Sequence, residues 1–170
     1  HHVAGTLRAP MVIPLRDLNP SSRRPYVTLL LIAANIVVFV LIQPRGGDSL
    51  EDIDRENRFL YEHAAVPCEI TTGSPLTFAE ITTGECGDAA GAGPVIRSEE
   101  PFFPSKNVYL AIYASMFLHG SWLHLGFNML FLWVFGNNVE DRLGHVGYLA
   151  FYLVTGVMAM LTQLAFEPGS

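Results

Sequence analysis

Charged residues are scarce in this 170-residue chain, making up 15% of it against about 25% in typical soluble domains. Basic residues are scarcest, with ten Lys and Arg against sixteen Asp and Glu. This argues against a nucleic-acid-binding protein, because phosphate contacts need a basic face. Two cysteines are too few for a disulfide scaffold. Half of the residues are hydrophobic, which leaves a membrane protein as the class to test.

Three uncharged stretches predict three membrane spans. The first, residues 26–43, would be roughly 27 Å long as a helix, close to the hydrocarbon thickness. A second uncharged stretch, residues 107–139, is too long for one straight span. We therefore expect a dipping or interfacial segment at 108–119 and a span at 121–138. The third span is predicted at 146–166.

Residues 44–107 are predicted to form a long hydrophilic loop between the first two spans. Residues 45–106 carry five basic and twelve acidic residues and show no sustained helical periodicity. A short amphipathic helix at 50–62 is compatible with the pattern, followed by turns at 72–75, 83–86 and 87–94. Two alternatives stay open for Cys68 and Cys86: free thiols, or a disulfide that would contribute about 3 kcal/mol to stability.

The basic residues next to the first span predict the orientation. They are Arg8, Arg16, Arg23 and Arg24, opposed only by Asp17. By the positive-inside rule, residues 1–25 form a cytoplasmic N-terminal segment and the acidic loop is extracytoplasmic. A signal peptide is the alternative reading of residues 26–43, but this apolar run is longer than a signal-peptide core, and no small-residue cleavage site follows it.

His119, His124 and Asn128 are polar residues within the second uncharged stretch. Polar groups at membrane depth are costly, so they usually face a protein interior or a water-filled cavity. On a helix capped by Ser121, His124 and Asn128 are one turn apart and share a face. His119 would lie in the loop that enters this helix, and Gly126 and Gly136 would let neighbouring backbone approach it.

An imidazole N–H and a carboxamide NH2 aimed into one cavity could stabilise an oxyanion, with each donor contributing about 2.7 to 4 kcal/mol. Zinc is a weaker alternative, because the H-x4-H spacing lacks the i, i+4 geometry and no Cys or Asp lies nearby as a third ligand. The structural alternative is that His124 and Asn128 only hydrogen-bond between helices. At the cytoplasmic end, Glu140 and Asp141 are read as a solvated turn with Arg142 as a local partner.

The segment after residue 118 reads HGSWLHLGFNMLFLWVFGNNVEDRLG, and the opening reads MVIPLRDLNPSSRRPYVTLLLIAANIVVFV. Both segments, in this order, resemble the rhomboid family of intramembrane serine proteases. The resemblance implies an all-α membrane protein, whose residues 26–170 are a partial rhomboid-like membrane domain. They would form the first three transmembrane helices of a six-helix bundle, with a long extracytoplasmic loop between helices 1 and 2.

The resemblance also implies roles for individual residues. His124 and Asn128 match positions that help form the oxyanion hole, His119 matches a histidine near the cavity mouth, and Glu140 matches a structural acidic residue. The family's serine in a GxSG motif and its later histidine base are absent, and His145 is expected on the cytoplasmic side. A nucleophile needs a base within reach, so we expect the 170-residue chain alone to be inactive and truncated before the serine helix.

The resulting hypothesis is the N-terminal portion of a rhomboid serine endopeptidase that cleaves transmembrane substrates. Its expected partners are transmembrane protein substrates, the lipid bilayer and the missing C-terminal helices of the same protein, with no nucleic acid, metal or cofactor. The expected location is a bacterial plasma membrane. Two alternatives are a non-catalytic rhomboid-like adaptor that binds transmembrane helices and a transporter fragment with a polar site at mid-membrane.

Overall fold

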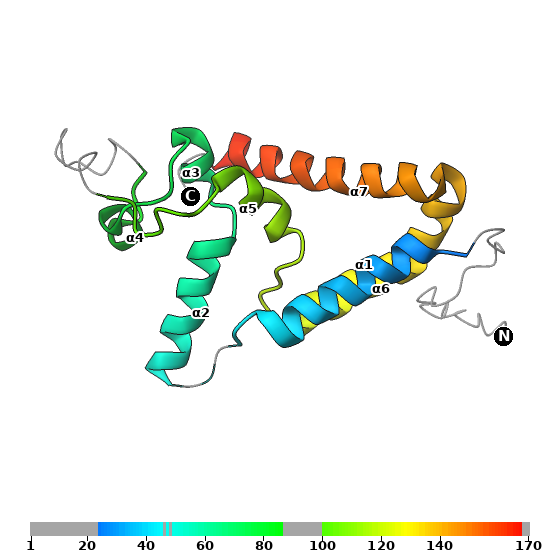
Figure 1. The fold of residues 1–170 in the computed structure, drawn as a ribbon, viewed down its shortest axis with the longest axis horizontal. Coiled ribbons are helices and arrows are strands. Elements are labelled where there is room, and N and C mark those ends of the chain that lie inside the picture. The colour runs from blue at the N-terminus through cyan, green and yellow to red at the C-terminus, as the bar shows by residue number, and fades with distance from the viewer. Residues whose placement is uncertain (1–23, 46, 48, 87–99, 168–170) are drawn as a thin grey trace, which may run out of the picture.

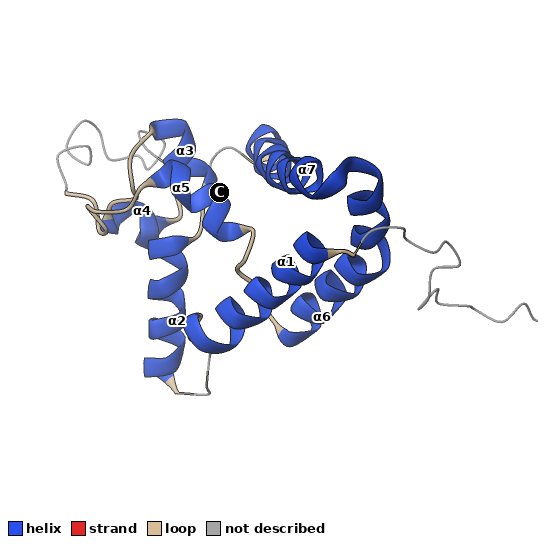
Figure 2. Ribbon diagram, turned by 45° about the vertical axis from the view of Figure 1, so that its right-hand side comes forward, coloured by secondary structure: helices blue, strands red, loops and turns tan. Residues whose placement is uncertain are grey.

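The computed structural model describes residues 24–45, 47, 49–86 and 100–167, and this part of the chain is helical apart from its loops and one isolated β-bridge (Figures 1 and 2). The expectations for residues 1–23 and for the turn at 87–94 fall outside the described residues. In chain order the elements are α1 (Tyr26–Val37), η1 (Val38–Ile42), α2 (Leu50–His63), α3 (Pro67–Thr72), α4 (Phe78–Thr83), α5 (Val108–Ser115), α6 (Trp122–Phe131), η4 (Leu132–Gly136) and α7 (Asn137–Phe166).

Helix α1 continues into the π-helical turn η1, so that one apolar helical run covers Tyr26–Ile42, inside the first predicted span. This run is apolar but shorter than a helix long enough to cross a membrane. Pro25 occupies the N-cap and offers no side-chain cap, which leaves the backbone N–H groups of Val27 and Thr28 without a local partner, whereas the Tyr26 N–H donates to the Arg24 carbonyl. The Glu140 carboxylate, from the start of α7, accepts the N–H groups of Val27 and Thr28 at 2.9 and 2.8 Å. It therefore caps α1 from a position more than a hundred residues away.

The expectation that Glu140 lies in a solvated turn is wrong. Its side chain has no exposed surface, and it accepts further hydrogen bonds from the Thr28 hydroxyl at 2.7 Å and from Nδ1 of His145. Asp141 and Arg142 likewise lie within α7 rather than in a turn. The sequence alone could not show that uncapped N–H groups at the start of α1 would lie beside Glu140. Their hydrogen bonds keep its carboxylate buried.

The helices α6, η4 and α7 form one continuous run, Trp122–Phe166, which is long and apolar enough to cross a membrane by length and hydropathy. The Ser121 hydroxyl caps its start by accepting the His124 N–H at 3.1 Å, as predicted. The run bends at Gly144, whose φ of 72° is open to glycine but strained for other residues. The bend therefore separates the two segments predicted as spans. It falls just after Glu140, Asp141 and Arg142, where the turn was expected.

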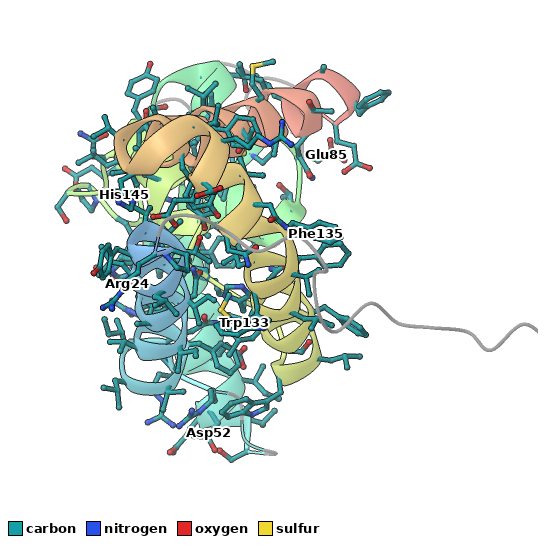
Figure 3. The ribbon with its side chains drawn as sticks, turned by 90° about the vertical axis from the view of Figure 1, so that its right-hand side faces the viewer. Arg24, Asp52, Glu85, Trp133, Phe135 and His145 are labelled. Atoms are coloured by element: carbon teal, nitrogen blue, oxygen red, sulfur yellow. A yellow bond between two sulfur atoms is a disulfide. The ribbon has the colours of Figure 1, made fainter. Side chains whose placement is uncertain are left out.

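Antiparallel packing of α1 against α6 and η4 forms the centre of the fold (Figures 1 and 2). Gly136 lies at this contact, where a Cβ would come within 2.6 Å of the Tyr148 hydroxyl and 3.0 Å of Thr28 Cγ2. Side chains, rather than the neighbouring backbone that was expected, approach Gly136 closely, whereas a Cβ on Gly126 would meet nothing within 4 Å. In Figure 3, Arg24 and His145 lie at one end of α1 and Asp52 lies beyond its other end.

Large apolar side chains cover the outward faces of these helices. They include Leu30, Leu41, Phe131, Trp133, Val146 and Phe151. Contiguous exposed apolar surface of this kind marks contact with lipid or with another protein segment. The distribution agrees with the membrane-type bundle expected from the scarcity of charge.

The segment between α1 and α5 is more ordered than the predicted loop. The amphipathic helix expected at 50–62 is present as α2, and the short helices α3 and α4 follow it, each ending at a glycine with φ of 72°. Cys68 and Cys86 form a disulfide, which decides between the two alternatives left open above. A buried ion pair between Lys106 and Glu69 joins α3 to the chain that leads into α5, the helix found in the segment predicted as interfacial.

Candidate functional site

A cavity of about 620 Å³ lies between α1, α5, α6, η4 and α7. Most of its lining is apolar, and polar side chains from several elements interrupt this surface. The polar lining residues that matter below are Asn35, Ser115, His119, His124, Asn128 and Tyr152. A largely apolar cleft with a few convergent polar groups is the usual form of a small binding or active site.

His124 and Asn128 reach this cavity from the first two turns of α6. Their spacing of four residues places them on one helix face, as the sequence analysis predicted. His124 is exposed and Asn128 is half-buried, and neither side chain makes a hydrogen bond to any other residue that the structure describes. Their donor groups are therefore free to meet a group that enters the cavity.

His119 lines the same cavity from the loop between α5 and α6. The carboxamide of Gln43, at the end of η1, fixes its backbone twice: Nε2 donates to the His119 carbonyl at 2.8 Å, and Oε1 accepts its N–H at 3.1 Å. The His119 ring packs edge-on against Phe39 and lies 5.2 Å from the His124 ring, measured between centroids. The sequence predictions named His119 but missed Gln43, which lies at the end of the first uncharged run.

Burial lowers the pKa of the His119 imidazole below the ordinary histidine value. A hydrogen bond from Nδ1 to the Phe117 carbonyl acts in the opposite direction, and the nearby His124 lowers the pKa further. His119 is therefore held neutral near pH 7, because its environment disfavours the imidazolium form.

Asn35 was not singled out from the sequence, although it is a polar residue within the first span. Its side chain is 1% exposed and lines the cavity opposite α6. Its Nδ2 donates to the Leu31 carbonyl one turn earlier at 2.7 Å. Tyr152, on α7, approaches the Asn35 carboxamide. A polar residue amid an apolar run was the available signal, and it is the same signal that identified Asn128.

A serine also lines the cavity, but its hydroxyl is already engaged. Ser115 Oγ donates to the Ala111 carbonyl at 2.9 Å and accepts the Ala65 N–H at 2.7 Å. Within the described part of the chain, no three His, Cys, Asp or Glu side chains gather to hold a metal ion. What this arrangement offers chemically is a set of hydrogen-bond donors, which suits stabilisation of developing negative charge.

Comparison with known proteins places this region in a family. Residues 106–170 match the family model of the rhomboid domain. Over 52 residues the chain is 47% identical to the rhomboid-like protein 11, chloroplastic, of Arabidopsis thaliana, a match that covers 31% of this chain. The chain spans 19% of the length of that relative. No solved structure matches it significantly.

The matched residues include α5, α6, η4 and α7 together with the loop between α5 and α6, and so they include His119, His124 and Asn128. The family consists of integral membrane proteins, in agreement with the apolar outer surface of the helices. The domain match over residues 106–170, the plant relative and the helical architecture together support a rhomboid-family protein.

Proposed function

We propose that this chain is the N-terminal portion of a rhomboid intramembrane serine protease and supplies one side of its active site. The observation that carries the proposal is the convergence of His119, His124 and Asn128 on one cavity within the matched domain. In this proposal the nucleophilic serine and its histidine base come from helices of the same protein outside these 170 residues. The substrates are transmembrane proteins, cleaved at the peptide bond that enters the cavity.

The proposed chemistry follows from the donors. When a serine oxygen attacks the scissile carbonyl, the carbonyl oxygen becomes negatively charged. His124 and Asn128 both line the cavity from one helix face, so in this proposal their side-chain N–H groups would meet that oxygen. Donors of this kind, fixed before the reaction, stabilise the oxyanion by about 2.7 to 4 kcal/mol each. His119, which is buried and held by Gln43, would shape the cavity mouth beside His124.

The disulfide supports the proposed orientation. Such bonds form and persist in oxidising compartments, so the segment that holds Cys68 and Cys86 belongs on that side of the membrane. The N-terminus then lies on the reducing, cytoplasmic side, as the basic residues indicate. We propose a bacterial plasma membrane as the location. A membrane-impermeant maleimide should label both cysteines in intact cells only after reduction. Labelling without reduction would contradict the disulfide, and labelling only after the cells are broken would contradict the orientation.

The proposal is tested by reading the coding sequence beyond codon 170 and by assaying the complete protein on a transmembrane substrate. We expect a GxSG motif followed by a histidine-bearing span. In the complete protein, Asn128→Ala should reduce kcat about 100- to 1,000-fold, the usual effect of removing one oxyanion donor. The matched control is Asn57→Ala, an exposed position on α2, which should leave kcat unchanged. Unchanged cleavage in Asn128→Ala would remove Asn128 from the site.

A non-catalytic rhomboid-like adaptor is the second candidate. It is favoured by the engaged state of Ser115, since this cavity-lining serine has its hydroxyl bound to backbone groups. An adaptor would bind transmembrane helices through the same polar face without cleaving them. A complete reading frame that lacks both the serine motif and the later histidine would decide for the adaptor.

A further inference from the structure

The carboxamide oxygen of Asn35 is a buried acceptor without a partner. Oδ1 makes no hydrogen bond to any group in the described parts of the chain, although the side chain is 1% exposed. The Asn35 Nδ2 donates one hydrogen bond to the Leu31 carbonyl, so the oxygen is the side-chain atom that has no partner at all. A buried acceptor with no partner costs about 1 to 3 kcal/mol, and such groups are rare in native proteins. A hydrogen-bond donor would therefore stabilise Oδ1 of Asn35, and such a donor can reach it from the cavity.

The antiparallel register of α1 and α6 places Asn35 at the depth of Asn128. At one end, Phe39 packs on Trp122 with ring centroids 4.9 Å apart. At the other end, Thr28 lies against Gly136. Counting along both helices from these two contacts sets Asn35 opposite the turn formed by residues 126–129. Asn128 and Met129 of this turn line the cavity, and Asn128 is the polar one of the two.

The two carboxamides are complementary in hydrogen bonding. Asn35 presents an acceptor oxygen, whereas the Asn128 NH2 is a donor with no bond to any residue that the structure describes. The Tyr152 hydroxyl, on α7, is a third polar group close to the Asn35 carboxamide. A buried water needs two to four polar partners and about 30 Å³ of space, and the cavity of about 620 Å³ provides that space.

We propose that Asn35 and Asn128 together hold one ordered water molecule at mid-depth in the cavity. The water donates to Oδ1 of Asn35 and accepts one N–H of the Asn128 NH2, which leaves the second N–H of Asn128 directed at the oxyanion position. Asn35 is thus a positioning residue, because it acts on the reacting carbonyl only through Asn128. This inference rests on the proposed function of the cavity, but the water site itself is measurable without catalysis.

The test uses the 170-residue chain in lipid bilayers with labelled asparagine, and it measures magnetisation transfer from water to side-chain amides by solid-state NMR. We expect transfer to both Asn35 and Asn128. Asn35→Leu, which is close in size but has no acceptor, should abolish the transfer to Asn128. Asn35→Asp keeps an acceptor oxygen and should restore it. The matched control is Thr155→Val, on the same cavity, where the lost hydroxyl bonds only to carbonyls of its own helix.

Folding of each variant is checked by far-UV circular dichroism and by formation of the Cys68–Cys86 disulfide. Absence of water transfer to Asn35 in the unmodified chain would overturn the inference. So would unchanged transfer to Asn128 in Asn35→Leu, since a cavity filled by mobile water does not depend on one acceptor. Either result would leave the oxyanion role intact if Asn128→Ala still slows cleavage in the complete protein, so the two proposals fail separately.

Discussion

Replacing Glu140 with glutamine should destabilise the fold strongly without changing the size of the side chain. One carboxylate oxygen accepts the N–H and the hydroxyl of Thr28, and the other accepts the Val27 N–H and the His145 imidazole. Each hydrogen bond to a charged group contributes about 1.5 to 3 kcal/mol. Glutamine removes the charge and places an NH2 against two donors. Breaking such a buried network costs about 3 to 5 kcal/mol, the loss we expect here.

The assay is the free energy of unfolding of the chain in detergent micelles, obtained by titration with SDS and followed by circular dichroism. Glu62→Gln is the matched control, because it makes the same chemical change at an exposed position of α2 and should alter stability by less than about 0.5 kcal/mol. Thr28→Val, combined with Glu140→Gln in a double-mutant cycle, should show a coupling of about 1 kcal/mol or more. If Glu140→Gln lowers the free energy of unfolding no more than Glu62→Gln does, this carboxylate does not cap α1.

Three further predictions concern the disulfide, a helix contact and a histidine. Replacing Cys68 and Cys86 with serine should cost about 3 kcal/mol by the loop-entropy model, measured as faster amide exchange in α3 and α4. Gly136→Ala should cost about 1 to 3 kcal/mol in the same SDS titration, because its Cβ would lie 2.6 Å from a tyrosine hydroxyl, whereas Gly126→Ala should be neutral or slightly stabilising. Because burial lowers the pKa of His119, the unfolded chain takes up a proton at this position at a higher pH than the folded chain does. The contribution of His119 to stability is thus fully present above the ordinary histidine pKa, and stability falls as the pH drops through that value toward the lowered pKa of the folded chain. The variant His119→Gln should make stability depend less on pH in this range. An equal slope in both proteins would contradict this reasoning.

Much of the membrane architecture could be predicted from the distribution of charge. An uncharged run has to be helical at membrane depth because its backbone groups find no water there, and the runs at 26–43 and 121–138 are indeed helical. The cap at Ser121 and the shared face of His124 and Asn128 followed from local geometry. These features depend on neighbours within a few residues, which a sequence displays directly.

The remaining features depend on contacts between distant residues. Glu140 looks like an ordinary surface acid until α1 is seen to lack a cap of its own. Gln43 reads as the polar end of a span, yet its carboxamide pairs with the backbone of His119. The short helices α3 and α4 escaped prediction because each is only six residues long. Asn35 could have been proposed from its polarity, but its register against Asn128 needed the packed pair.

The helical run formed by α1 and η1 is held by polar contacts at both ends, by Glu140 on Thr28 at its start and by Gln43 on His119 at its end. A longitudinal slip of α1 by a single turn, about 5.4 Å, would break both contacts at once. The helix is therefore fixed along its own axis by the contacts at its two ends. Thickening or thinning of the surrounding bilayer should consequently be met by tilting of the whole α1–α6 pair rather than by sliding of one helix along the other.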